Sequence, residues 1–213
     1  MKKLRIGIGL LVAFALWTVA VSFVDVQMIG PQGSSVGFAT VNRFVHALTG
    51  VHFGLYTITD WLGLVPVGVC VGFGVLGLVQ WIRRKKLRNV DRSLLLLGGF
   101  YIVTAAVYLL FEEVVINYRP VLIGGYLEAS YPSSTTMLVL CVMPTTMIQL
   151  RKRIEHAALR RCVNGVIAGF IGFMVIGRLL SGVHWVTDIV GGVLLSAGLV
   201  TAYDSLISWE QQK

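Results

Sequence analysis

His184 and Asp188, four residues apart, stand in the segment GRLLSGVHWVTDIVGG near the carboxyl end of the chain. On a helix this spacing puts the two side chains on one face, within reach of each other. The carboxylate can then hold one imidazole nitrogen as N–H and leave the other nitrogen free and basic, as a nucleophilic histidine requires. Because the same spacing is common in plain interfacial hydrogen bonds, the pair indicates catalysis only if groups of matching chemistry accompany it.

Two arginines could bind an anion beside this pair. Arg119 precedes a proline in INYRPVL, and Arg178 lies six residues before His184. A guanidinium group is a planar donor that suits the bidentate binding of a phosphate. An arginine at the end of a membrane span can also be only an anchor, whose charge reaches the headgroups.

A third polar group, in LEASYPSSTTMLVL at 127–140, leads directly into an apolar run. Proline fits the first turn of a helix, where backbone N–H groups are free, and serine hydroxyls beside them attract anions. We therefore predict that a helix starts at Pro132 and that Ser133, Ser134 and Thr135 form one wall of an anion site. The same residues would also suit a simple helix cap.

The elements that must position these groups are membrane spans. Of the 213 residues, 56% are hydrophobic and 13% are charged, and the mean hydropathy is +0.80. This composition excludes a soluble globular protein and indicates a polytopic membrane protein. Since a span needs about 20 apolar residues, we predict an all-α, six-helix transmembrane bundle that forms a single domain over 1–213. The predicted spans cover residues 4–24, 61–82, 93–112, 132–150, 162–182 and 185–207.

The basic residues predict the orientation, because short loops rich in Lys and Arg stay in the cytoplasm. Fifteen of the 18 Lys and Arg residues fall on one side of the predicted membrane topology, near the two termini and in the connections at 83–92 and 151–161. We therefore expect both termini in the cytoplasm and the three polar groups at the extracytoplasmic face. Contact with anionic headgroups explains the net charge of +8, so no nucleic-acid partner is expected. The compact form and the Met-Lys-Lys start are typical of a bacterial cell-membrane protein.

Two further features complete the prediction from composition. The first run is expected to be a retained span, because no clear small-x-small cleavage site follows it. The segment at 25–60 is too polar and glycine-rich to span, so we predict a loop with short amphipathic helices along the outer surface. In it, Phe44, Val45 and Leu48 would face lipid or the bundle.

Metal binding is a further option for the polar residues. Glu112, Glu113, His184 and Asp188 could offer ligands, but one histidine among carboxylates has no recognisable ligand spacing. We expect neither a metal nor another cofactor.

In order and spacing, these groups resemble the type-2 phosphatidic acid phosphatases, also called lipid phosphate phosphatases, which share their site with vanadium haloperoxidases. That family has three motifs: Lys, six residues, Arg-Pro; Pro-Ser-Gly-His; and Ser-Arg, five residues, His, three residues, Asp. Here Arg119-Pro120 matches the end of the first motif and Pro132-Ser133 the start of the second, while the third is matched by Arg178, His184 and Asp188. Six spans with an outward-facing site match as well.

The resemblance implies a role for each matched residue. His184 would be the nucleophile that forms a phosphohistidine, and Asp188 would orient it. Arg119, Arg178 and Ser133 would hold the phosphate.

Four positions depart from the family pattern: Glu112 replaces its Lys, Ser134 its Gly, Thr135 its general-acid His, and Gly177 its leading Ser. A carboxylate at 112 would repel a phosphate dianion unless it is protonated or paired. Arg119, seven residues on, is a candidate partner if the helix continues that far. Thr135 cannot protonate a leaving alkoxide as an imidazolium can.

Two function classes therefore remain open. In the first, the protein is a lipid phosphate or pyrophosphate phosphatase, or a phosphotransferase, whose substrate has a leaving group that needs little protonation. In the second, it binds or transports a phosphorylated lipid without turning it over. The presence of His184, Asp188 and the two arginines favours the enzyme, since binding alone has no need of a His–Asp pair. The substitutions at positions 112 and 135 favour the binding protein.

Overall fold

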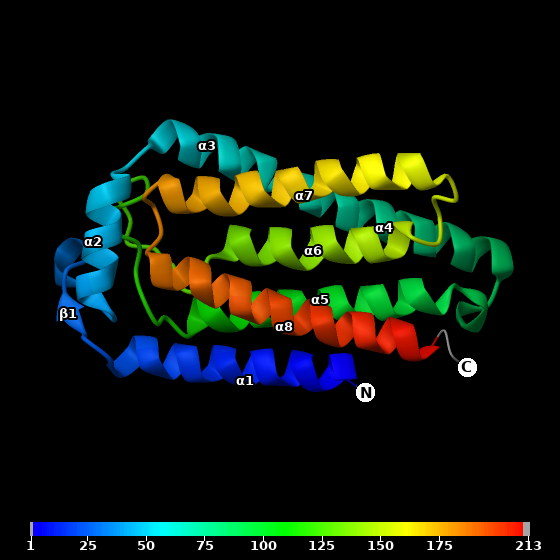
Figure 1. Ribbon diagram of the computed structural model, residues 1–213, viewed down its shortest axis with the longest axis horizontal. Coiled ribbons are helices and arrows are strands. Elements are labelled where there is room, and N and C mark those ends of the chain that lie inside the picture. Colours follow the sequence, from blue (N-terminus) through cyan, green and yellow to red (C-terminus); the bar gives the residue numbers. More distant parts are fainter. Residues whose placement is uncertain (1, 211–213) are drawn as a thin grey trace.

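The computed structural model describes residues 2–210, and most of them are helical (Figure 1). The long helices match the predicted spans within a few residues at most ends. They are α1 (Lys2–Phe23), α4 (Leu64–Arg84), α5 (Arg92–Glu113), α6 (Ser134–Leu150), α7 (Ala157–Leu180) and α8 (Val186–Glu210). Shorter elements are β1 (Gln27–Met28), η1 (Pro31–Gly33), β2 (Ser35–Val36), α2 (Ala39–Thr49), α3 (Phe53–Leu62) and η2 (Leu87–Asn89).

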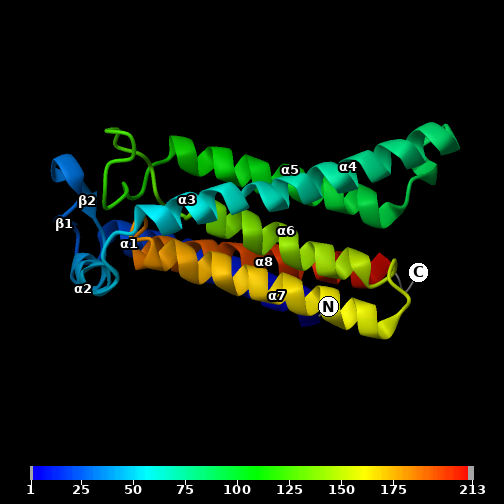
Figure 2. The ribbon, with the colours of Figure 1, turned by 90° about the horizontal axis from the view of Figure 1, so that it is seen from above.

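The long helices run side by side along one axis, with α6 in the middle (Figures 1 and 2). Helix α6 packs against α4, α5, α7 and α8, and α1 lies along α8. Within residues 2–210, five helical runs are long and apolar enough to cross a membrane, and α6 is a shorter apolar helix of 17 residues. The chain is therefore an all-α, multi-pass membrane protein.

Two apolar clusters hold the bundle together around α6. The larger one joins α1, α5, α6 and α8, and includes Phe14, Leu97, Met137 and Leu195. The smaller one joins α6 to α7 through Val139, Met143, Ile167 and Met174. Because α6 contributes to both, its position is determined from two sides, and so is the position of its first turn.

Helices α1 and α8 approach each other closely at small residues, as membrane helices often do. A Cβ atom placed on Gly7 would lie 2.9 Å from the backbone nitrogen of Ala202, so only glycine fits at this contact. The contact fixes α8, which begins at Val186, two residues after His184.

The segment after α1 covers one end of the bundle, at the left of Figure 1. Strands β1 and β2 pair antiparallel, with Gln27 opposite Val36. Helix α2 leaves Phe44 and Leu48 largely exposed and is amphipathic. Its buried Asn42 donates from Nδ2 to Oγ1 of Thr187 at 3.0 Å and accepts from the Thr187 backbone, which ties α2 to the start of α8.

The predicted boundary between this outer segment and the second span was wrong. Helix α3 starts at Phe53 and passes into α4 with only Gly63 between them, so that Phe53–Arg84 is one apolar run of 32 residues. The threonines that make α3 look polar bond back to its own carbonyls. Oγ1 of Thr57 donates to the Phe53 carbonyl at 2.9 Å, and Thr59 does the same with Leu55. Such bonds satisfy the hydroxyls inside a helix.

Candidate active site

The third polar group forms the start of α6, but the helix begins two residues later than predicted. Pro132 lies outside it, joined to Tyr131 by a cis peptide bond, and Ser133 is the N-cap. The backbone N–H of Ser133 donates to the carbonyl of Asp188 at 3.1 Å, whereas its buried Oγ atom has no hydrogen-bond partner. The N–H groups of a first helical turn also have no acceptor within the helix. This end of α6 is thus a donor-rich wall, with Ser134 and Thr135 half-buried beside it.

His184 is held in a tight connection between α7 and α8. Gly182 has φ of +69°, and a Cβ atom at that position would collide with the carbonyl oxygen of Gly50. His46 on α2 contacts the Gly182 carbonyl at 3.1 Å from Nε2, and the His52 backbone N–H donates to Ser181 at 2.9 Å. The outer segment at 25–60 therefore helps to position His184, whose side chain is buried.

Both predicted arginines converge on one nitrogen of His184. Nη1 of Arg119 lies 3.1 Å from Nε2 of His184, and Nη2 of Arg178 lies 3.2 Å from the same atom. A guanidinium group can only donate, so Nε2 is the acceptor and the proton of a neutral imidazole sits on Nδ1. Arg119 and Arg178 thus meet at the basic lone pair of His184, although the sequence places these three residues in two separate outer connections.

The surroundings favour the neutral form of this histidine. Burial lowers the pKa of His184 well below its ordinary value of 6.5, and the positive charges of Arg119 and Arg178 lower it further. An imidazole that stays neutral keeps its Nε2 lone pair, and that lone pair is what a nucleophile needs.

Asp188 is close to His184 but does not bond to it as the sequence suggested. Oδ2 of Asp188 lies 3.8 Å from Nδ1 of His184, which is beyond hydrogen-bond length. The buried carboxylate instead accepts from the hydroxyl of Ser130 at 2.8 Å, from the backbone of Trp185 at 2.9 Å and from Nδ2 of Asn117 at 3.2 Å. Asp188 therefore ties three segments of the site together and places a negative charge near the imidazole.

The side chain of Arg178, at the end of α7, is held in position by residues of α3. Its guanidinium carbon lies 5.0 Å from the ring centre of Tyr56, and Nη1 is 3.5 Å from Oγ1 of Thr59. Asp60 forms an ion pair with it at 3.7 Å. Nε of Arg178 is buried without a partner, so the group keeps donor capacity for a ligand.

Arg119 lies in a hairpin-like loop between α5 and α6. Its backbone N–H donates to the carbonyl of Glu128 at 3.0 Å, and Nε is 2.9 Å from Oε2 of the same residue. The predicted pairing with Glu112 does not form, because α5 ends at Glu113 and the helix does not continue to Arg119. Glu112 instead lines a small pocket with Tyr108 and Ser134.

Several residues of the site were not found from the sequence: Tyr56, Thr59, Asp60, Asn117, Glu128 and Ser130. Asp60 could have been found from the sequence, since it is the one acidic residue between positions 26 and 90 and stands in an apolar run. Asn117 and Ser130 face each other across the loop, where the Ser130 N–H donates to the Asn117 carbonyl at 2.9 Å. That pairing depends on how the loop folds, and the spacing of the two residues along the chain did not indicate it.

The arrangement suits the binding of a tetrahedral oxyanion next to a nucleophile. Two guanidinium groups, the free hydroxyl of Ser133 and the first turn of α6 supply donors, and His184 supplies a lone pair. Among residues 2–210, no group of three His, Cys, Asp or Glu side chains comes together in a way that could hold a metal ion.

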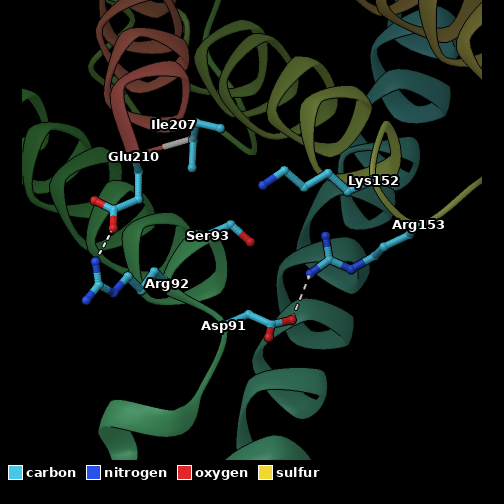
Figure 3. Close-up of a pocket in the computed structure, with 7 residues that line it drawn as sticks. All are labelled: Asp91, Arg92, Ser93, Lys152, Arg153, Ile207 and Glu210. Atoms are coloured by element: carbon cyan, nitrogen blue, oxygen red, sulfur yellow. Dashed lines mark hydrogen bonds and ion pairs between the residues drawn. The ribbon is translucent and has the colours of Figure 1, made fainter. Parts of the chain in front are cut away.

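A separate cavity of about 390 Å³ lies at the other end of the bundle (Figure 3). It is lined by charged side chains from the start of α5, the connection after α6 and the end of α8. Arg92 pairs there with Glu210, and Arg153 with Asp91. None of the predicted site residues lines it, so it takes no part in the chemistry above.

Comparison with known proteins agrees with this fold. Residues 97–211 match the model of the PAP2 superfamily, and the chain belongs to that family. Over 88 residues it is 36% identical to phosphatidylglycerophosphatase B of Bacillus subtilis, a match that covers 39% of this chain and 43% of the relative. The crystal structure of a transmembrane PAP2-type phosphatidylglycerolphosphate phosphatase from Bacillus subtilis is similar, with a TM-score of 0.60 and 18% identity over 98% of this chain and 97% of that one.

Proposed function

We propose that the protein is an integral membrane phosphatase that cleaves a phosphorylated lipid through a phosphohistidine at His184. The observation that carries the proposal is the convergence of Arg119 and Arg178 on Nε2 of this residue, at 3.1 and 3.2 Å. Membership of the PAP2 superfamily and the likeness to phosphatidylglycerophosphatase B support a lipid phosphate as the substrate.

The reaction proceeds in two displacements. In the first, the Nε2 lone pair of His184 attacks phosphorus, the N–P bond forms, and the bridging P–O bond breaks so that its electron pair leaves with the lipid oxygen. The two arginines and the α6 first turn bind the remaining phosphoryl oxygens and stabilise their charge. In the second, water attacks phosphorus, the N–P bond breaks and inorganic phosphate leaves with Nε2 restored. Asp188, 3.8 Å from Nδ1, stabilises the positive charge of the phosphorylated imidazole.

The substitution at Thr135 selects the leaving group. A threonine hydroxyl does not protonate an alkoxide near neutral pH, and a missing general acid typically costs about 10²–10⁴-fold in rate. A phosphate leaving group, with its pKa near ~6, needs no such proton. Lipid pyrophosphates are therefore the better substrates in this proposal.

A binding or transport protein is the second candidate, favoured by the same Thr135 and by Glu112 in place of the family lysine. It would use the arginines and the α6 first turn to hold a phosphorylated headgroup without turnover.

The site would face the extracytoplasmic side. The connections rich in Lys and Arg, at 83–92 and 151–161, belong to the end of the bundle opposite α2, while His184 lies at the α2 end (Figures 1 and 2). Because basic connections stay in the cytoplasm, this asymmetry supports an outward site with both termini inside.

Phosphate release by the purified protein tests the proposal. In detergent it should release inorganic phosphate from a lipid pyrophosphate and, more slowly, from phosphatidic acid. His184→Ala should abolish release, and His156→Ala should not, because His156 only caps α7 at the other end. Full activity in His184→Ala would contradict the mechanism. Tight lipid binding without release of phosphate would assign the protein to the binding class.

A further inference from the structure

The second displacement needs a group that accepts a proton. When water attacks the phosphorylated His184, its oxygen bonds to phosphorus and one of its protons must leave. An imidazole that has protonated a leaving group can take a proton from water in the next step, but Thr135 can do neither. A base in this role typically contributes about 10²–10⁴-fold to a rate. Another group beside the phosphate must therefore accept the proton.

Of the four carboxylates described at the site, Asp60 is the one that is not engaged elsewhere. Asp188 accepts three hydrogen bonds and lies on the Nδ1 side of the imidazole. Glu128 is bound to Nε of Arg119 at 2.9 Å. Glu112 lines a different, very small pocket. The position of Asp60, near the end of α3, is therefore the one to consider.

Asp60 contacts the same guanidinium group that reaches the nucleophile. Nη1 of Arg178 lies 3.7 Å from Oδ1 of Asp60, and Nη2 lies 3.2 Å from Nε2 of His184. A phosphoryl group bound to this guanidinium would thus lie next to both the nucleophile and the carboxylate. The ion pair is longer than a hydrogen bond, and within residues 2–210 the Asp60 carboxylate has no other partner. Its side chain is 58% exposed, so its oxygens can bind a water molecule.

Asp60 also lies beside the position at which the family pattern has its acid. It stands one helical turn before Gly63, and residues three apart share a face of a helix. A Cβ atom placed on Gly63 would lie 3.6 Å from Cγ2 of Thr135. Asp60 and Thr135 line the same cavity. The carboxylate is therefore close to the space that an imidazole at position 135 would occupy.

The packing of α3 on α7 holds Asp60 in this place (Figure 1). A Cβ atom placed on Gly177 would lie 2.8 Å from Cγ2 of Thr59, so the serine of the family pattern would push α3 away from Arg178. Asp60 is also the one acidic residue of the apolar run Phe53–Arg84. A carboxylate in such a run is costly and by default suggests a function.

We propose that Asp60 is the general base of the second displacement and replaces the acid–base group that position 135 lacks. This role rests on the proposed function, since it acts on the phosphorylated His184. An Oδ atom of Asp60 accepts a proton from water, the oxygen of that water bonds to phosphorus, and the N–P bond breaks with its electron pair returning to Nε2. Asp60 then releases the proton to solvent as phosphate leaves. A good leaving group needs no acid in the first displacement, and Asp60 supplies the base in the second.

Asp60→Asn separates the two displacements. Asparagine keeps the shape of the side chain but does not take up a proton near neutral pH. The purified protein is mixed rapidly with a lipid pyrophosphate labelled with ³²P at its terminal phosphate, and the label is then chased with unlabelled substrate. Phosphorylation of Asp60→Asn should stay close to the wild-type rate, whereas loss of the label should slow by about 10²-fold or more. The variant should therefore accumulate phosphohistidine while its kcat falls.

Two further variants serve as references. Oγ1 of Thr59 lies 3.5 Å from Nη1 of Arg178, and Thr59→Val removes this contact while keeping the shape of the side chain. Thr59→Val should slow phosphorylation and should accumulate no label. Glu113→Gln removes an exposed carboxylate at the end of α5 and should resemble the wild type in both steps.

The outcomes distinguish a base from a residue that only positions Arg178. If Asp60→Asn slows phosphorylation as Thr59→Val does and accumulates no label, the proposed base is overturned. Accumulation of label in Glu112→Gln but not in Asp60→Asn would assign the base to Glu112 and overturn it as well. In both cases, turnover through phosphohistidine in the wild type would keep the proposed function. Turnover by the wild type without phosphohistidine would contradict the proposed function and the role of Asp60 together.

Discussion

Nη1 of Arg119 and Nε2 of His184 lie 3.1 Å apart although 65 residues separate them in the chain. Arg178 reaches the same nitrogen from α7 at 3.2 Å. Because both groups only donate, the imidazole must be neutral and its lone pair directed at the two cations. A bound phosphate would take these donors and leave the lone pair facing phosphorus.

Replacing either arginine by lysine should impair the site while the charge is kept. A lysine ammonium cannot reproduce the planar, two-point donation of a guanidinium. We expect Arg119→Lys and Arg178→Lys each to lower kcat by about 10²-fold or more, the usual loss when a donor to the transition state is removed. Arg43→Lys is the matched control, since Arg43 is an exposed residue of α2 that bonds only Gln27 among the described contacts. Equal rates in all three variants would contradict the assignment.

Acid should affect this protein less than an ordinary histidine enzyme. Burial and the two arginines lower the pKa of His184 well below 6.5, so the nucleophile stays unprotonated as the medium becomes mildly acidic. The acid limb of the pH profile of kcat/KM should therefore lie below pH 6.5.

The same shift affects stability. The unfolded chain takes up a proton on this histidine below its ordinary pKa of 6.5, while the folded chain does not. The stabilising contribution is thus complete above pH 6.5 and is lost as the pH falls from there toward the depressed folded pKa. The wild type should lose more thermal stability between pH 7 and 5 than His184→Gln. Equal losses would contradict a depressed pKa.

Much of the architecture could be predicted from the sequence because the membrane imposes it. Apolar length located the spans, and spacing located Arg119, Arg178, His184 and Asp188, which the structure brings together. The main error, the start of the second span at 61 instead of Phe53, arose because composition counts Thr57 and Thr59 as polar. It does not reveal that their hydroxyls bond within the helix.

The contacts of the site could not be predicted in the same way. Asp188 was expected to hold the imidazole, but it accepts instead from Ser130 and the Trp185 backbone. Arg119 was expected near Glu112, but pairs with Glu128 across a loop. The contacts of Ser130 and Glu128 depend on how the 114–133 loop folds back on itself, and the spacing of residues along the chain carries no information about that.

Restoring the family residues should redirect specificity. Thr135→His would supply a proton donor for an alkoxide, and Glu112→Lys would remove a negative charge near Ser134. The double variant should raise the hydrolysis of phosphatidic acid more than that of a lipid pyrophosphate, and so narrow the gap between them. Both changes are needed together, because a new imidazole beside the carboxylate could be held in an unproductive pair. An unchanged ratio would mean that residue 135 does not set the choice of leaving group.

The orientation can be tested by chemical labelling. In a background without Cys70, Cys141 and Cys162, single cysteines replace Tyr126 and Arg88, both exposed, at opposite ends of the bundle. A thiol reagent that cannot cross membranes should label Tyr126→Cys in intact cells and Arg88→Cys only after the cells are opened. The reverse pattern would place the site in the cytoplasm, and labelling of both in intact cells would overturn the predicted topology.

The central claim is that His184 becomes covalently phosphorylated. The purified protein is mixed for a short time with a lipid pyrophosphate labelled with ³²P at its terminal phosphate, then denatured in alkali. We predict label on the wild-type protein that is stable to alkali, lost in acid and recovered in the peptide containing His184, as expected of an N–P bond. His156→Ala should retain the label and His184→Ala should show none. Turnover by the wild type without any trapped label, or equal labelling of His184→Ala, would contradict the phosphohistidine mechanism.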